Sequence, residues 1–182
     1  MKLSYRPEID GLRAIAVVSV IIYHAQIFFF NQKIFEGGFI GVDIFFVISG
    51  YLITSLIYKE LITSGTFSFK YFYERRVRRI LPVLIFVILV SIPFAWLYLL
   101  PQSLINFSKS ILYSLGFSSN IYFWFSGQQY GAISSSLTPF LHTWSLSVEE
   151  QYYIFFPIIF LFTFKYFKKY LIYILTIGFF IS

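Results

Sequence analysis

Long, nearly uninterrupted runs of apolar residues dominate this chain, rather than an alternation of apolar and polar positions. A membrane-spanning helix needs roughly 20 mostly apolar residues. Four segments approach or reach that length with few formal charges, and a fifth is still apolar at the last residue. The pattern therefore predicts an all-α fold, a polytopic transmembrane helical bundle. Its expected spans are residues 11–30, 38–58, 80–100, 145–166 and, incompletely, 170–182.

The stretch 103–126 has a different pattern. It is rich in Tyr, Phe and Leu, but ten of its 24 residues are Ser, Asn or Lys. A complete crossing here would place the basic cluster 165–169 on the outer side of the membrane, against the usual charge distribution. We therefore expect 103–126 to form a re-entrant or surface-lying helix on the outer side, which brings the bundle to four or five spans plus this element.

Composition supports a membrane protein. Hydrophobic residues make up 58% of the 182 residues and charged residues only 12%, whereas soluble domains carry roughly a quarter charged residues. The polar surface is too small to cover a soluble globule. The absence of cysteine from the sequence excludes a disulfide framework, a thiolate metal site and a cysteine nucleophile.

A net charge of +6 could indicate a nucleic-acid-binding protein. The positions of the charged residues do not favour that interpretation. The largest group of Lys and Arg residues lies in the connection 59–79, between two predicted spans. Basic residues concentrate in cytoplasmic loops, so this connection and the amino terminus are predicted to be cytoplasmic. The basic charge then reports topology and contact with the lipid bilayer, and we expect no nucleic-acid partner.

Two ionisable residues share one face of the first predicted span. Arg13 and His24 are eleven residues apart, which at about 100° per residue leaves them roughly 20° apart around the helix and about 16 Å apart along it. Ionisable residues inside spans usually mark pathways or reaction centres. The alternatives are an interfacial arginine that extends to the headgroups and a histidine bonded to a neighbouring helix.

Two acidic residues are predicted at a similar depth. Asp43 in the second span and Glu149 near the start of the fourth are both expected in the outer half of the membrane, as is His24. A carboxylate beside an imidazole orients the ring and stabilises its charged form, which suits a general base. Either carboxylate could instead be a first-turn residue that interacts with a helix dipole.

Four arginines occur within five residues just before the third span. Arg76 and Arg79 are at spacing i,i+3 and so lie on one helix face. Guanidinium groups suit phosphate oxygens, which makes a phosphorylated ligand at the inner surface plausible. The alternative is that these arginines only set the topology.

Taken together, these segments resemble acyltransferase family 3, a family of integral-membrane acyltransferases. The resemblance extends over nearly the whole chain and rests on motifs in the right order and spacing. They are RPEIDGLRAIAVVSVIIYH (6–24), GVDIFFVISGYLI (41–53), FYERRVRRILP (72–82) and HTWSLSVEEQYY (142–153), with SNIYFWFSG (119–127) as a further match.

The resemblance implies an O-acyltransferase of the bacterial inner membrane. Such enzymes move an acyl group, usually acetyl from acetyl-coenzyme A, to a hydroxyl of a carbohydrate such as lipopolysaccharide O-antigen, peptidoglycan or exopolysaccharide. The family's arginine–histidine pattern falls on Arg13 and His24, its paired arginines on Arg76 and Arg79, and its carboxylate on Glu149. Relatives often differ at the next position, so we do not expect Glu150 to act.

The expected roles follow from these assignments. The catalytic residues are His24, as general base or nucleophile, with Glu149 or Asp43 orienting its ring. Arg13, Arg76 and Arg79 hold the acetyl-coenzyme A phosphates, and no metal is expected because two distant histidines make a poor ligand set.

Two other functions stay open at this point. The chain contains about half of the family's membrane helices, so it is expected to be a fragment or truncated reading frame, without the second half of the membrane unit and without the SGNH-type domain that often follows. It could then be inactive alone. A transporter component with a His/carboxylate path is the other alternative, although no paired repeat of the kind typical of transporters is visible.

Overall fold

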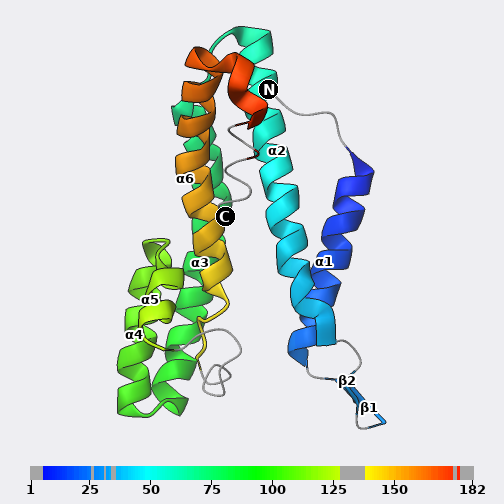
Figure 1. Ribbon diagram of the computed structural model, residues 1–182. Coiled ribbons are helices and arrows are strands. Elements are labelled where there is room, and N and C mark those ends of the chain that lie inside the picture. Colours follow the sequence, from blue (N-terminus) through cyan, green and yellow to red (C-terminus); the bar gives the residue numbers. More distant parts are fainter. Residues whose placement is uncertain are drawn as a thin grey trace. The chain divides into compact units, whose positions relative to one another are not determined.

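A computed structural model of the chain describes residues 6–25, 27–30, 32–33, 36–127, 138–173 and 176. The described part is almost entirely helical (Figure 1), which confirms the predicted all-α class. The chain divides into two compact units, residues 1–72 and 73–182. Each unit has its own packing and is described separately.

In the described part of the first unit, the long helices α1 and α2 follow each other in the chain, with a short hairpin between them (Figure 1). Two strands of two residues each pair as an antiparallel ladder between the helices. The elements are α1 (Pro7–Ala25), β1 (Phe28–Phe29), β2 (Gln32–Lys33), the 3-10 helix η1 (Glu36–Phe39) and α2 (Ile40–Ser64). Gly65, at φ +69°, ends α2 in the left-handed conformation that glycine adopts without a steric cost.

Helices α1 and α2 meet where both residues are small. Ala16 is fully buried, and a Cβ added to Gly41 would lie 2.5 Å from the Ala16 carbonyl oxygen and 2.7 Å from Cγ2 of Val20. No real Cβ tolerates such distances, so only glycine permits this approach. Close contact through small residues is the usual way in which membrane helices associate.

The second unit is built on the helices of the carboxyl half. Helix α3 begins in the first unit and continues into the second, α4 and α5 lie beside its far end, and α6 runs alongside it (Figure 1). The bounds are α3 (Phe69–Tyr98), α4 (Pro101–Leu115), α5 (Ser119–Phe125), α6 (Thr143–Tyr166) and the 3-10 helix η3 (Lys168–Tyr170).

The hydrophobic core of the second unit lies between the carboxyl half of α3, the helices α4 and α5, and the turn before α6. Its buried members are Leu84, Ile88, Ala95, Phe107, Phe123, Phe140 and Leu141. Many other large apolar side chains of α3 are exposed, among them Phe86 at 66% and Trp96 at 74%. An apolar exposed face is what a helix in contact with lipid requires.

Buried hydroxyl groups join three helices of this unit. Ser119 Oγ of α5 lies 2.7 Å from Ser147 Oγ of α6 and accepts a 3.0 Å bond from Thr143 Oγ1. Ser114 Oγ of α4 lies 2.8 Å from the same threonine oxygen. All four residues are at most 3% exposed. This hydroxyl network satisfies polar groups that would be costly in an apolar core, and it links α4, α5 and α6.

Two of the described helical segments, Glu36–Ser64 and Phe69–Tyr98, are long and apolar enough to cross a membrane. The helix bounds differ from those of the predicted spans. Helix α1 ends at Ala25, and Phe28 and Phe29 belong to the hairpin, not to a helix extending to residue 30. Of the predicted segment 170–182, residues 174–175 and 177–182 lie outside the described part.

Helix α3 begins well before the predicted span 80–100. The arginine-rich segment is therefore helical rather than a connection, since Arg, Glu and Lys are good helix formers. Pro82 consequently lies inside the helix together with Pro93. The stretch 103–126 is divided between α4 and α5, which have 15 and 7 residues.

Candidate active site

His24, in the last turn of α1, has an orientation set by its own helix. Its Nδ1 lies 2.9 Å from the carbonyl oxygen of Val20. A carbonyl can only accept, so Nδ1 carries the proton and donates it. This tautomer places the lone pair on Nε2, so Nε2 is the atom that can accept a proton or attack as a nucleophile. The ring also makes an edge contact with Tyr23, at 5.3 Å between centroids.

Arg13 lies on α1, half-buried. Its Nη1 is 3.5 Å from Oδ1 of Asp10, and the two side chains are 32% and 51% exposed. A pair this exposed contributes little to stability, so Arg13 can exchange Asp10 for another anion. Both Arg13 and His24 lie on one continuous helix, Pro7–Ala25, as their shared face requires.

Asp43 is one of the two carboxylates predicted to orient the imidazole ring of His24. It lies in the first turn of α2 with an exposed side chain, and among the described residues it makes no hydrogen bond or ion pair with His24. The hydrogen bond described for the ring goes to the Val20 carbonyl, and the orienting role of Asp43 stays a prediction. The first-turn position agrees with the alternative, a carboxylate that interacts favourably with the helix dipole.

Arg76 contacts α6 through an aromatic ring in the second unit. Its guanidinium carbon lies 4.5 Å from the centre of the Tyr153 ring, a cation–π distance. The Tyr153 hydroxyl donates a short hydrogen bond to the carboxylate of Glu149, one turn earlier on α6. Arg76, Tyr153 and Glu149 thus form one connected group, so two of the predicted site residues are joined by a third that was not predicted.

Glu150 lies beside this group. It is only 7% exposed, and its Oε1 has no hydrogen-bond partner within the described part of the chain. The charges of Glu150 and Arg76 act on each other electrostatically. A buried carboxylate oxygen without a donor is unfavourable and calls for an explanation.

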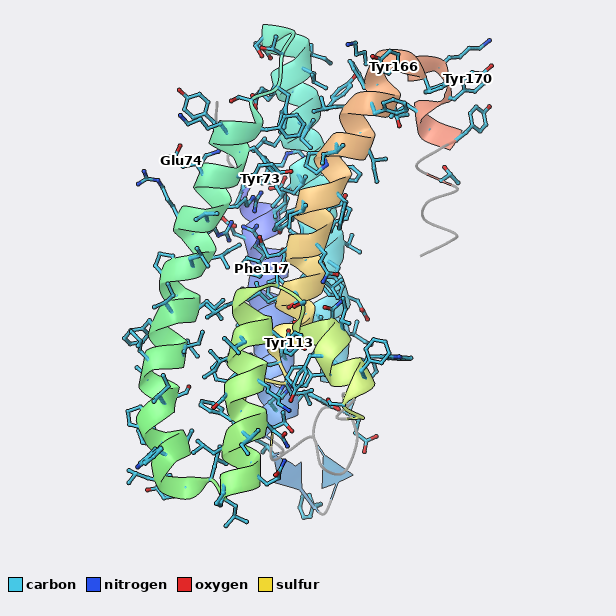
Figure 2. The ribbon with its side chains drawn as sticks, turned by 90° about the vertical axis from the view of Figure 1, so that its left-hand side faces the viewer. Tyr73, Glu74, Tyr113, Phe117, Tyr166 and Tyr170 are labelled. Carbon is cyan, nitrogen blue, oxygen red and sulfur yellow. The ribbon has the colours of Figure 1, made fainter. Side chains whose placement is uncertain are left out.

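Tyr73 joins α3 to α6 one turn before Arg76. Its hydroxyl donates a 3.0 Å hydrogen bond to the carbonyl oxygen of Ile154, and the side chain points from α3 toward α6, whereas Glu74 lies on the opposite side (Figure 2). Pro157, buried inside α6, lacks the amide proton that would bond the carbonyl of Tyr153. The proline therefore disturbs the regular bonding of α6 beside the contact with Arg76.

The other arginines of the cluster face outward. Arg79 is exposed, and its charge acts on Arg76. Arg78 pairs with Glu74 on the surface of α3, at 2.9 Å with side chains 77% and 41% exposed. The predicted pair Arg76 and Arg79 therefore combines one arginine held against α6 with one that is open to the surroundings.

The side-chain amides of Asn120 and Gln151 join α5 to α6. Gln151 Nε2 donates to the carbonyl oxygen of Phe117 at 2.8 Å and to Asn120 Oδ1 at 3.0 Å, and Asn120 Nδ2 donates back to Gln151 Oε1 at 3.2 Å. Phe117 has φ +48°, a conformation that is strained for a bulky residue. Figure 2 shows it at the end of α4, one turn beyond Tyr113.

A cavity of about 580 Å³ opens beside α5 and the start of α6. Its wall is mainly aromatic and includes Trp124 and Trp144, with Asn120 as the polar lining residue. Trp124 is 68% exposed. The described residues contain no group of three His, Cys, Asp or Glu side chains that could hold a metal ion.

Comparison with known protein families identifies the family of this chain. The family model described as an acyltransferase domain, that of acyltransferase 3, matches residues 6–182. The chain belongs to the acyltransferase 3 family. The resemblance carried by the four sequence motifs is thereby confirmed. No solved structure matches the chain significantly.

Curated relatives of this acyltransferase 3 chain include proteins of Staphylococcus aureus. A Staphylococcus aureus protein (strain MSSA476) named "Putative O-acetyltransferase" is 44% identical over 159 residues, which cover 87% of this chain and 25% of the relative. The O-acetyltransferase OatA of Staphylococcus aureus (strain COL) is 38% identical over 165 residues, covering 90% of this chain and 26% of OatA. The chain thus spans about a quarter of the length of these relatives.

The sequence analysis did not predict Tyr153 as a site residue, and it did not expect Glu150 to act. The signal that could have found them is helical spacing: Glu149 and Tyr153 are four residues apart, and Glu150 and Tyr153 three. Pairs at these spacings lie on one face of a helix. Which face of α6 meets Arg76 depends on tertiary packing, which the spacing does not contain.

Proposed function

We propose that the protein is a membrane-bound O-acyltransferase that moves an acetyl group from acetyl-coenzyme A to a hydroxyl of a cell-surface carbohydrate. The acceptor class is O-antigen, peptidoglycan or exopolysaccharide, and the location is the bacterial inner membrane with a cytoplasmic amino terminus. Membership of the acyltransferase 3 family over residues 6–182 carries this proposal. The relatives named as O-acetyltransferases support acetyl as the transferred group.

His24 has the chemistry that the transfer needs. With its proton on Nδ1 held by Val20, Nε2 takes the proton of the acceptor hydroxyl as that oxygen attacks the thioester carbonyl carbon. The carbon–sulfur bond then breaks, and the coenzyme leaves as a thiolate that is protonated to the thiol. General-base catalysis of this kind contributes about 10²–10⁴-fold in rate. Direct attack by Nε2, through a transient acyl-histidine, is a second route.

Arginines supply the anion-binding groups for the donor. Arg79 is exposed, Arg13 has only a weak surface pair, and the guanidinium of Arg76 is stacked through its face on Tyr153. A guanidinium suits phosphate oxygens because it is planar, always charged and rich in N–H donors. These residues suit the phosphate groups of coenzyme A.

The cavity beside α5 supports a carbohydrate acceptor. Trp124 and Trp144 offer flat apolar faces against which the C–H face of a sugar ring can stack, and Asn120 offers an amide to its hydroxyl groups. A concave, mostly aromatic site with a few polar groups is the usual form of a small-ligand site. A second membrane half and an SGNH-type domain are proposed partners of this chain.

The proposal is tested in cells that express the complete coding sequence and in cells from which it has been deleted. Mass spectrometry of purified surface polysaccharides should find ester-linked acetyl groups, each adding about 42 Da by the replacement of a hydroxyl hydrogen with an acetyl group, only in the first. Equal acetylation in both strains would overturn the proposal. Retention of acetyl transfer by cells that express residues 1–182 alone would show that the chain itself suffices.

A further inference from the structure

The side-chain amide of Gln151 on α6 is held in one orientation by the backbone of the turn before α5. Its Nε2 donates a 2.8 Å hydrogen bond to the carbonyl oxygen of Phe117. A carbonyl oxygen can only accept a hydrogen bond, so the nitrogen of the Gln151 amide, and not its oxygen, faces Phe117. The two ends of a glutamine amide are similar in shape, and this contact distinguishes them.

The orientation of Gln151 sets that of Asn120 on α5. Gln151 Nε2 also donates to Asn120 Oδ1 at 3.0 Å, and Asn120 Nδ2 donates to Gln151 Oε1 at 3.2 Å. Turning the Asn120 amide over would bring donor against donor and acceptor against acceptor, so Asn120 has one favourable orientation. Within the described part of the chain, these two bonds leave Asn120 with one N–H and one lone pair of Oδ1 for a further partner.

The backbone around this amide pair is fixed as well. The backbone N–H of Ser119 donates a 3.2 Å bond to Ser147 Oγ of α6, and both residues are at most 1% exposed. Phe117, labelled in Figure 2, has φ +48° at a helix end where glycine is the usual residue. The direction of its carbonyl is therefore kept at a cost in backbone strain, and such strain concentrates at active sites and at sites that hold ligands.

Asn120 is the amide-bearing residue in the wall of the aromatic cavity. The cavity has a volume of about 580 Å³, and Trp124 and Trp144 contribute aromatic rings to its wall. A ligand without polar groups would leave the amide of Asn120 without a partner, which costs affinity. A sugar suits both parts of the wall, because its C–H face packs on aromatic rings and its hydroxyl groups both donate and accept hydrogen bonds.

We propose that Gln151 is a positioning residue of the acceptor site, which holds the amide of Asn120 in the orientation that recognises a hydroxyl group of the carbohydrate acceptor. The inference rests on the proposed function. Asn120 contacts the acceptor, whereas Gln151 acts through Asn120 and touches neither the acceptor nor the acyl donor. A site built to hydrogen-bond a hydroxyl group discriminates against a compound that lacks it, so the pair contributes to acceptor specificity.

The test is steady-state kinetics on membranes from cells that express the complete coding sequence, with surface polysaccharide isolated from the deletion strain as the varied substrate. Asn120→Ala should raise the KM for polysaccharide about threefold to tenfold, the effect of losing a hydrogen bond between neutral groups. Gln151→Met, which keeps the length of the side chain without its amide, should raise this KM about threefold, because Asn120 can then turn. In both variants, kcat and the KM for acetyl-coenzyme A should stay near the wild-type values. An unchanged KM for polysaccharide in either variant would overturn the inference.

A double variant separates positioning from a structural role. If Gln151 acts only through Asn120, then Asn120→Ala with Gln151→Met should have the same KM for polysaccharide as Asn120→Ala alone, because interacting residues are not additive. Additive increases, or a parallel rise in the KM for acetyl-coenzyme A, would overturn the inference. The matched control is Gln102→Met, the same chemical change at an exposed residue of α4, which should leave both KM values unchanged.

Membrane abundance of each variant is measured by immunoblotting. If Gln151→Met does not accumulate, Gln151→Glu carries the test, because a carboxylate of the same size lacks the N–H groups that bond Phe117 and Asn120. Its KM for polysaccharide should also rise, and an unchanged value would overturn the inference. Absence of any transfer from acetyl-coenzyme A by the wild type would overturn the proposed function and this inference with it. An active wild type with unaffected Gln151 variants would overturn this inference alone.

Discussion

Nδ1 of His24 donates a hydrogen bond of 2.9 Å to the carbonyl oxygen of Val20, one turn earlier on the same helix. A histidine normally exchanges between two neutral tautomers, and a bond to a carbonyl selects the one with its lone pair on Nε2. The backbone of α1 therefore supplies the orientation that a carboxylate supplies in many histidine-based active sites. In this structure a local contact within α1 orients the residue that we propose as the general base.

His24→Ala should lower kcat for acetyl transfer about 10²–10⁴-fold, because it removes the proposed general base. Initial rates with acetyl-coenzyme A and isolated surface polysaccharide, on membranes with equal amounts of enzyme, provide the measurement. The KM for acetyl-coenzyme A should change little, since the imidazole acts on the acceptor hydroxyl. A variant with a normal rate would remove His24 from the mechanism.

Asp43→Asn should lower the same rate by less than about tenfold, far less than the loss of a catalytic base. The reason is that the hydrogen bond described for the ring goes to Val20, while Asp43 occupies the first turn of α2, where its charge contributes about 0.3–1 kcal/mol to the helix. The rates of acetyl transfer by Asp43→Asn and His24→Ala, measured in one assay, should therefore differ. Equal losses would make Asp43 a partner of His24 in the working enzyme.

Arg79→Gln should raise the KM for acetyl-coenzyme A about tenfold or more, since a hydrogen bond to a charged group contributes about 1.5–3 kcal/mol. The wild-type KM should also rise with ionic strength, because salt screens exposed charges. The control is Arg78→Gln, which removes an arginine already paired with Glu74 on the surface. Equal effects of the two substitutions would indicate that only the total basic charge matters.

The helical class was predictable because a membrane-spanning segment must be a long apolar helix, and the sequence contains several long apolar segments. The residues at which the helices begin and end were not predictable. Helix α3 extends back through Arg76 and Arg79 to Phe69, because its charged residues are good helix formers outside lipid as well. Hydrophobicity predicts which part of a helix contacts lipid, but it does not predict the residue at which the helix begins.

The candidate site was predictable only in part, for a similar reason. Helical spacing correctly placed Arg13 and His24 on one continuous helix, since that relation is local. One hydrogen-bond partner of His24 is a backbone carbonyl, which no side-chain pattern reveals. The contact of Arg76 with Tyr153 joins two helices that are distant in sequence, and it depends on how α3 packs beside α6.

Ser119→Ala should destabilise the second unit by about 1 kcal/mol, the usual cost of a lost hydrogen bond. The Ser119 hydroxyl is fully buried and bonds both Ser147 and Thr143, so its removal leaves two buried hydroxyl groups with fewer partners. Thermal unfolding of the detergent-solubilised protein measures the effect. Ser108→Ala is the control, since Ser108 is exposed and bonds a carbonyl of its own helix, and it should leave the unfolding temperature unchanged.

Gly41→Ala should destabilise the contact between α1 and α2 by about 1–3 kcal/mol, the usual cost of overpacking. The new Cβ would lie 2.5 Å from the Ala16 carbonyl oxygen, which is backbone and cannot rotate away, and 2.7 Å from Cγ2 of Val20. The helices must then separate or shift.

Because the Val20 carbonyl also holds His24, Gly41→Ala should lower acetyl transfer as well as the unfolding temperature. Gly11→Ala, on α1, is the matched control: a Cβ there meets nothing within 4 Å, and the change from glycine to alanine inside a helix should stabilise it by about 0.5–1 kcal/mol. Opposite shifts in the unfolding temperature of the two variants are the expected result. A Gly41→Ala variant as stable as Gly11→Ala would show that α1 and α2 do not meet at Gly41.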